Sequence, residues 1–274
     1  MTPEIVRRLF NVPLAIHRPN AEALLELLRA RERADVYQIE DIQKDDGVTW
    51  RSFDLVNGIA VIPIHGILVH GEAWWGGWGE ISYQSIDRTI TEAIADPEVR
   101  AIAMHINSPG GEVAGCFDLA EKIAALRRVK PIWAILDECA YSAAYALACA
   151  AEYIVVPRTG GTGSIGVIAM RVDITGMLEK MGVKIHTLKF GAYKTDTYPE
   201  EPLTPEGEKR LQADVDTLGE MFVSLVAKNR GMEATKIKAM QAGTFLGEQG
   251  KTAGLADAVM NPQEAFRLMS NQEF

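Results

Sequence analysis

The sequence predicts an α/β protein with a largely parallel sheet, followed by a mainly helical last third. From residue 56 onward, short runs rich in β-branched residues alternate with segments of helical period. Regular alternation of strand and helix favours parallel strands joined by right-handed crossovers. The 274 residues are 47% apolar, which is enough to build a large hydrophobic core and excludes a disordered or collagen-like chain.

The expected elements follow one another along the middle of the chain. The expected strands are 59–69 (one strand or a bent pair), 99–106, 131–136, 153–156, 165–172 and 184–190. The expected helices between them are 83–95, 113–128, 142–151 and 174–181. No internal repeat interrupts this order.

The first 50 residues have a different composition. Asn20 can cap a helix that contains four leucines between residues 24 and 28. Ten of the eighteen residues in 29–46 are charged, which is typical of an exposed helix end and linker. We therefore expect an N-terminal helical extension and charged linker over 1–50, and one domain over 51–274.

A long helix is expected in the last third. Thr204 and Pro205 are a helix start signal, acidic residues fill the first turn, and basic residues precede Gly231 at the end. Its apolar seam consists of Leu211, Val215, Leu218, Phe222 and Leu225. We expect this seam to pack within the protomer rather than against a neighbouring subunit.

Charge and cysteine content exclude several functions. The net charge of −9 and the pI near 5.2 repel phosphate backbones, so we expect no nucleic-acid partner. Cys116, Cys139 and Cys149 form no C-x-x-C pair, which argues against a disulfide framework or a zinc site and favours a reducing compartment. We find neither the apolar stretch of a signal peptide nor about 18 consecutive apolar residues, and expect a cytoplasmic protein without a membrane span.

Two turns could carry chemistry. Gly110 and Gly111 lie between an expected strand and a helix, where uncovered backbone N–H groups can bind an oxyanion. Ser142 begins the alanine-rich helix that follows strand 131–136. A serine at that place is either an ordinary N-cap or a nucleophile favoured by the helix dipole. The local sequence leaves both interpretations open.

A nucleophilic serine needs a base. Of the five histidines, His17 belongs to the N-terminal extension, whereas His65 and His70 lie in or just after the first strand region. His105 and His186 fall inside expected strands and are typical of sheet-face residues, so a Ser-His-Asp triad has no support. Lysine is the other option, because a desolvated ammonium loses its proton readily. Lys194 follows the last expected strand, among small and aromatic neighbours.

Taken together, these segments resemble the signal peptide peptidase A family of serine peptidases, which adopt the Clp-protease/crotonase-type α/β fold of repeated β-β-α units. The resemblance covers about residues 57–259. It rests on four motifs in the family's order: Ile106-Asn107-Ser108-Pro109-Gly110-Gly111, Ser142 before its alanine-rich helix, Thr162-Gly163-Ser164-Ile165-Gly166-Val167, and Gly191-Ala192-Tyr193-Lys194.

The resemblance implies a role for each matching residue. Ser142 corresponds to the nucleophile, Lys194 to its general base, and Ser164 to the serine that orients the lysine. The backbone N–H groups of Gly111 and Ala143 correspond to the oxyanion hole. Such a Ser-Lys dyad needs no metal or organic cofactor, because it supplies both nucleophile and base.

Within that family, the resemblance is greatest to the head-maturation or capsid-assembly proteases of tailed phages, through residues 13–28, 57–63 and 111–118. It implies a peptidase domain over 51–274 that cleaves extended or unfolded polypeptides. It also implies ring- or dome-like homo-oligomers with scaffold, portal or capsid proteins as partners, acting in the host cytoplasm or the procapsid interior.

Three alternatives stay open. A bacterial cytoplasmic signal-peptide-peptidase-like protease would share the chemistry, and a crotonase-like acyl-CoA enzyme would share the fold without needing Ser142, Ser164 and Lys194 together. A catalytically dead shell protein would keep the fold for its interfaces. The tryptophans at 74, 75 and 78 form an aromatic loop that either packs on the core or serves as a subunit contact or groove wall.

Overall fold

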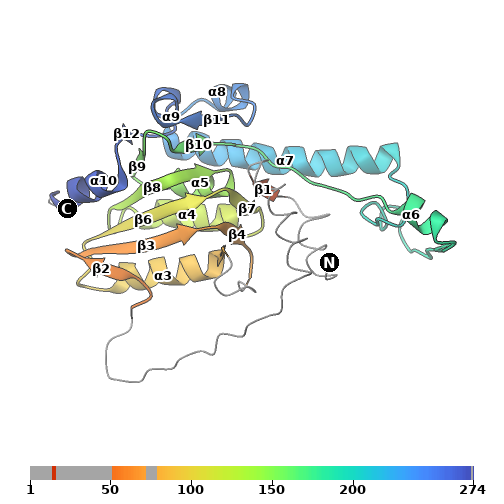
Figure 1. The fold of residues 1–274 in the computed structure, drawn as a ribbon, viewed down its shortest axis with the longest axis horizontal. Helices are drawn as coiled ribbons and strands as arrows, with labels where there is room; N and C mark the ends of the chain where they lie inside the picture. Colours follow the sequence, from red (N-terminus) through yellow and green to blue (C-terminus); the bar gives the residue numbers. More distant parts are fainter. Residues whose placement is uncertain (1–13, 17–50, 72–78, 273) are drawn as a thin grey trace, which may run out of the picture.

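A large, mainly parallel sheet forms the centre of the molecule in a computed structural model that describes residues 14–16, 51–71, 79–272 and 274 (Figure 1). Its strand order is β11-β10-β8-β6-β3-β2, and β9 and β12 extend it beside β8. The strands are β2 (Asp54–Val56), β3 (Ile59–His65), β6 (Ala101–Ser108), β8 (Ile132–Tyr141), β9 (Tyr153–Val156), β10 (Gly161–Gly163), β11 (Thr244–Leu246) and β12 (Ala258–Val259). Only the β2–β3 and β10–β11 pairs are antiparallel, so the expected parallel sheet is confirmed.

A second sheet continues from the carboxyl ends of two central strands. Its order is β1-β7-β4-β5, with β1 (Leu14–Ile16), β4 (Ile67–Val69), β5 (Glu80–Ser82) and β7 (Gly110–Glu112). The chain passes from β3 into β4 through Gly66, and from β6 into β7 through Pro109 and Gly110. Gly66 and Gly110 have φ angles of 87° and 105°, which side chains rarely tolerate. β3 and β6 are thus each followed by short-strand structure before the next helix, whereas β8 leads directly into α5.

Helices cover the two faces of the large sheet unequally. One face carries α3 (Tyr83–Ala95), α4 (Cys116–Leu126), α5 (Ala143–Ala148) and the C-terminal half of α7 (Pro205–Arg230), around a core that includes Ile64, Met104 and Phe222. The opposite face carries α10 (Pro262–Ser270) over Ala103 and Ile135. Alternate residues of one strand enter different cores because successive side chains point to opposite faces. The remaining helices are α6 (Thr175–Lys180), α8 (Ala234–Ala239) and α9 (Gly247–Ala253).

The long helix α7 has the ends that the sequence predicts. Thr204 accepts a hydrogen bond from the Gly207 N–H as the N-cap, and Gly231 ends the helix in the left-handed conformation. The expected packing of its seam within the protomer holds for the C-terminal half, where Phe222 and Leu225 are buried. Its N-terminal half extends beyond the sheets beside residues 165–203, which we name the arm (Figure 1).

Two predicted strands are wrong. Residues 165–172 and 184–190 form no strand, although their composition favours one, and within the arm only α6 is a regular element. The physical reason is that a strand needs a partner to accept its backbone hydrogen bonds. Among the described residues neither segment pairs with a strand, and Ile168 forms only an isolated bridge. The tryptophan loop and the helix expected after Asn20 lie outside the described residues.

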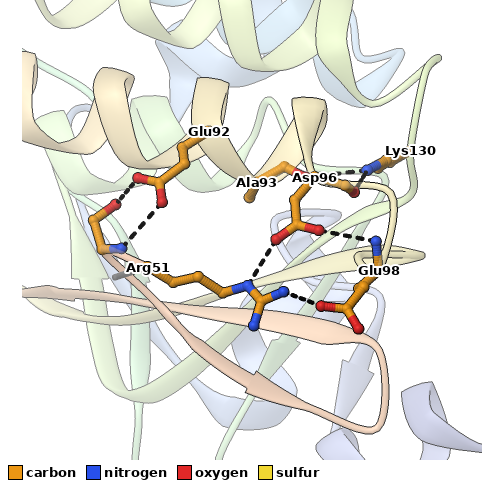
Figure 2. Close-up of polar contacts among 7 residues, drawn as sticks. Arg51, Glu92, Ala93, Asp96, Glu98 and Lys130 are labelled. Atoms are coloured by element: carbon orange, nitrogen blue, oxygen red, sulfur yellow. Dashed lines mark hydrogen bonds and ion pairs between the residues drawn. The ribbon is translucent and has the colours of Figure 1, made fainter. Parts of the chain in front are cut away.

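A polar cluster fixes the entry to β2 against the end of α3 (Figure 2). The Arg51 guanidinium pairs with Asp96 at 2.7 Å and also with Glu98. Lys130 donates to the backbone carbonyl of Asp96 at 2.6 Å. The hydrogen bond from Arg51 is the main cause that lowers the pKa of Asp96 from its usual 3.8. Asp96 therefore stabilises the fold only while it is ionised.

We expect Asp96→Asn to lower the melting temperature near neutral pH and to remove part of the acid sensitivity. Because the folded pKa lies below the unfolded one, the contribution of Asp96 is complete above pH 3.8 and is lost as pH falls through the lowered value. Thermal melts from pH 7 to pH 2 should show the two proteins converging at the acid end. Asp54→Asn, which removes the exposed carboxylate of β2, is the matched control. If the melting temperatures of Asp96→Asn and the wild type differed by the same amount at every pH, the expectation would be contradicted.

No helix in the described ranges has both the length and the apolar character needed to cross a bilayer.

Candidate active site

Ser142 lies at a sharp turn between β8 and α5. Its backbone has φ 53° and ψ −120°, a conformation that costs a residue with a side chain about 1–3 kcal/mol. The turn is held in place because the Ser142 N–H donates to Gly163 O at 2.9 Å and Ser142 O accepts from the Ala146 N–H at 3.0 Å. Strained backbone on a strand-to-helix turn is typical of positions that present a nucleophile.

The hydroxyl of Ser142 is not used for capping. Ser142 precedes α5, yet its side chain accepts no hydrogen bond from the first turn of that helix. Ser142 therefore occupies the N-cap position without the side-chain hydrogen bond of an ordinary N-cap. Within the described part of the chain its Oγ makes one hydrogen bond, to the Gly166 carbonyl oxygen at 3.4 Å, which is longer than a normal O–H···O bond. The residue is only 1% exposed, so its hydroxyl is buried and weakly bonded.

Ser164 lies next to Ser142 at the ends of neighbouring parallel strands. Gly163 of β10 pairs with Tyr141 of β8, so each serine is the first residue after a paired position. Adjacent strands are about 4.8 Å apart. Ser164 also has a positive φ of 55° and is 8% exposed. The structure therefore brings together these two of the predicted site residues.

The glycine strand β7 approaches Ser142 from the other side. A Cβ atom built on Gly110 would lie 3.0 Å from the Ser142 Cβ, so the backbone of Gly110 contacts the serine directly. Gly111 is even more closely packed, because a Cβ there would lie 1.8 Å from the Leu68 carbonyl oxygen of β4. Ala143, the first residue of α5, is fully buried beside Ser142. The glycine strand thus packs directly against the turn that holds Ser142.

The four described histidines do not complete a triad with Ser142. His105 lines a cavity of about 420 Å³ with Ala103 on the α10 face of the sheet, opposite to α5. His186 is exposed on the arm rather than in a sheet. His70 contacts Gln84, with 3.2 Å between the ring and amide nitrogens.

A polar row on the α10 face was not expected from the sequence. His65 Nε2 and His105 Nδ1 are 3.2 Å apart, and Asp137 Oδ1 lies 3.7 Å from His105 Nε2. Burial first, and His65 second, lower the pKa of His105, whereas Asp137 raises it. The pairing of β3, β6 and β8 creates this row, and no spacing in one sequence segment shows it.

Lys194 lies on the arm, away from Ser142. Its neighbours Tyr193 and Asp196 are both tied to Arg210 near the start of α7, with Arg210 3.7 Å from the Tyr193 ring centre and 2.7 Å from the Asp196 carboxylate. At its other end, α7 meets α5 where Asn229 approaches Cys149. About 28 Å of helix separates Arg210 from Asn229, whereas α5 is only about 9 Å long.

Lys194 itself is exposed, and none of the hydrogen bonds or ion pairs among the described residues joins it to Ser142. Within one chain, the structure therefore brings Ser142, Ser164, Gly111 and Ala143 together and leaves Lys194 apart.

Two solved structures are similar to this chain over most of its length. A crotonase-type enoyl-CoA hydratase/isomerase from Legionella pneumophila has a TM-score of 0.48 and 12% identity, over 79% of this chain and 72% of that one. A ClpP1 mutant from Listeria monocytogenes has a TM-score of 0.45 and 13% identity, over 74% of this chain and 92% of that one.

Curated relatives are proteases and phage head proteins. The chain is 38% identical over 224 residues to the head-tail preconnector protein GP5 of Enterobacteria phage P21, covering 80% of this chain and 44% of the relative. It is 36% identical over 227 residues to the capsid assembly protease C of Escherichia phage lambda, covering 82% and 52%. The chloroplastic serine protease SPPA of Arabidopsis thaliana is 30% identical over 235 residues, covering 83% and 35%.

The chain thus spans about half the length of the two phage relatives. The family description "Peptidase family S49" matches residues 124–273, more than half of this chain. That range includes Ser142, Ser164 and Lys194. The chain belongs to peptidase family S49.

Proposed function

We propose that this chain is a serine endopeptidase that cleaves extended or unfolded polypeptide segments, with Ser142 as the nucleophile. The observation that carries the proposal is the state of Ser142. Its hydroxyl is buried on a strained turn, does not cap the helix that follows, and among the described residues makes one long hydrogen bond. Backbone strain costs folding free energy and is found mainly at functional sites. Presenting the Ser142 hydroxyl for attack on a substrate carbonyl is such a function.

The backbone around Ser142 suits the stabilisation of an oxyanion. When Ser142 Oγ attacks the scissile carbonyl, negative charge forms on the carbonyl oxygen, and the N–H groups of Gly111 and Ala143 are the proposed donors. The serine proton passes to the base and then to the leaving amine. Water hydrolyses the resulting ester, which restores Ser142 and releases the second product.

Lys194 is the proposed base, supplied by a second copy of the chain. The arm holds Lys194 near Arg210, far from Ser142 of its own chain, so a neighbouring subunit must bring its arm to the site. The position of Ser164 beside Ser142 supports a role in which Ser164 accepts a hydrogen bond from that lysine and orients it. Burial between subunits would also desolvate the amine, which favours its neutral form.

The surface of the arm supports assembly. Its exposed apolar side chains are Ile168, Met177, Met181, Val183, Ile185, Leu188, Phe190, Tyr193 and Tyr198. Leu188 and Phe190 are 98% and 101% exposed, which is costly for a monomer in water. Segment 184–190 has strand composition but pairs with no strand in the described part of the chain, and a second copy would supply a partner.

The similarity to the two phage proteins favours a role in phage head maturation. On this proposal, the substrates are scaffold, portal or capsid proteins, and the enzyme acts in the host cytoplasm or within the procapsid. Extended segments of such proteins would enter the site between subunits.

Incubation of the purified full chain with a permanently unfolded protein, followed by mass spectrometry of the fragments, tests the proposal. We expect new peptide termini from the unfolded protein and none from a stably folded protein at the same concentration. Size-exclusion chromatography on the same sample establishes that the chain is assembled. An assembled preparation that leaves the unfolded protein intact would refute the endopeptidase proposal.

Gly111→Ala tests the glycine strand separately. Its methyl group would lie 1.8 Å from the Leu68 carbonyl oxygen, so β7 must shift and the Gly111 N–H with it. Loss of one oxyanion donor lowers turnover by about 10²–10³. Gly176→Ala is the matched control, because a methyl group there meets nothing within 4 Å. Equal kcat for the two variants would exclude Gly111 from the site.

A further inference from the structure

The short strand β1 covers the edge of β7 next to Ser142. It runs antiparallel to β7, with Ala15 opposite Gly111, Leu14 opposite Glu112 and Ile16 opposite Gly110. On its other side β7 pairs with β4, so β1 occupies its one remaining edge. A free strand edge offers unpaired N–H and C=O groups, which bind extended peptides by strand addition.

β1 also approaches the serine closely. A Cβ atom built on Gly110 would meet the Ala15 carbonyl oxygen at 2.2 Å and the Ser142 Cβ at 3.0 Å. The backbone of Ala15 and the side chain of Ser142 therefore contact the same glycine. Ala15 is fully buried, so a closed space holds its methyl group. Residues 14–16 of the chain thus have an extended conformation beside the proposed nucleophile.

We propose that residues 14–16 occupy the place of the substrate backbone and act as an intramolecular competitor. A polypeptide substrate displaces β1 and pairs with β7 in the same antiparallel register, Gly110–Glu112 being its docking strand. The inference rests on the proposed function, because it assigns the substrate strand to the site of Ser142. The residue that replaces Ala15 must have a small side chain, since the space beside Gly111 is closed.

The length of β1 is consistent with displacement. Its three residues make one strand pair, and 37 residues separate Ile16 from Asp54 at the start of β2. A short peripheral strand opens at a lower free energy than the central sheet. Backbone pairing with β7 also allows substrates of different sequence to bind. The affinity comes from backbone hydrogen bonds, and only some of the substrate side chains enter pockets.

Ala15→Trp tests the competitor role, because an indole does not fit the space of a buried methyl group and must expel β1. The apparent affinity for substrate falls with the fraction of closed molecules, so the variant should lower KM for the unfolded substrate about fivefold or more, with kcat unchanged. Ala15→Ser, which preserves the size of the side chain, should keep the wild-type KM. An unchanged or raised KM in Ala15→Trp would overturn the proposal.

A binding experiment separates this inference from the proposed function, because it needs no turnover. A fluorescent peptide of residues 11–19 is titrated into full-length Ser142→Ala and into Ser142→Ala/Ala15→Trp. We expect at least about fivefold tighter binding to the double variant, and displacement by unfolded substrate. If the peptide binds the double variant more tightly but the wild type cleaves no substrate, the peptidase proposal is refuted and the competitor role of β1 stands. If the wild type cleaves substrate but the peptide binds both variants equally, the competitor role is refuted and the peptidase proposal stands.

Hydrogen exchange covers the case in which Ala15→Trp does not fold. Ser142→Ala is measured with and without excess unfolded substrate. Displacement predicts that the amides of residues 14–16 lose protection while those of residues 110–112 keep it, because the substrate replaces β1 on the same strand. Unchanged protection at residues 14–16 on substrate binding would show that β1 is a permanent part of the sheet.

Discussion

Ser142→Ala will lower the turnover of an unfolded protein by a factor on the order of 10⁵, because the variant lacks the hydroxyl that we propose forms the acyl-enzyme. The fold should survive, since alanine keeps the Cβ atom that packs against Gly110. Ser164→Ala should cause a smaller loss, on the order of 10², because the proposed role of Ser164 is to position the base without touching the scissile bond. Both losses are measured as kcat from fragment quantification by mass spectrometry.

Ser142→Gly supplies a matched control on stability. Glycine tolerates φ 53° and ψ −120°, so it removes strain that serine and alanine share. We expect Ser142→Gly to raise the free energy of unfolding by about 1 kcal/mol relative to Ser142→Ala, with both variants inactive. Denaturant titration measures this difference. Retained activity in either variant would exclude Ser142 as the nucleophile, whereas equal stabilities would contradict only the strain argument.

The sequence predicts elements whose signals are local. Helix α3 has the predicted bounds 83–95, and α7 begins after Thr204 and ends at Gly231 as its capping residues indicate. The turn that presents Ser142 was also expected at the end of a strand, because alternating strand and helix patterns place such turns at the carboxyl edge of the sheet. These features depend on residues close together in the chain.

Features that depend on distant partners were not predicted. The three-residue strands β1 and β7 carry no periodic signal, and β7 contains two glycines that disfavour a strand. The strained turn determines whether the Ser142 side chain caps its helix. That turn is held in place by pairing with β10, which lies later in the chain. Segment 184–190 has the composition of a strand, yet composition does not say whether its partner belongs to the same chain.

Mixing two inactive variants will restore activity if the base comes from a neighbouring subunit. Ser142→Ala keeps Lys194 and Lys194→Ala keeps Ser142, so an assembly of both contains some sites with both groups intact. With random mixing at equal amounts, roughly one quarter of the sites pair an intact serine with an intact lysine. Co-expressed variants should therefore regain about one quarter of the wild-type rate, although each alone is inactive.

A second mixture makes the result quantitative. Wild type co-expressed with the double variant Ser142→Ala/Lys194→Ala keeps about half of its sites if each chain supplies its own dyad, but about one quarter if neighbouring chains share it. The exposed position of Lys194, beside Arg210 at the far end of α7 from α5, predicts the lower value. If the second mixture kept half of the wild-type activity and the first mixture recovered none, each chain would supply its own dyad by folding the arm back onto itself. The proposal of a site shared between neighbouring chains would then be wrong.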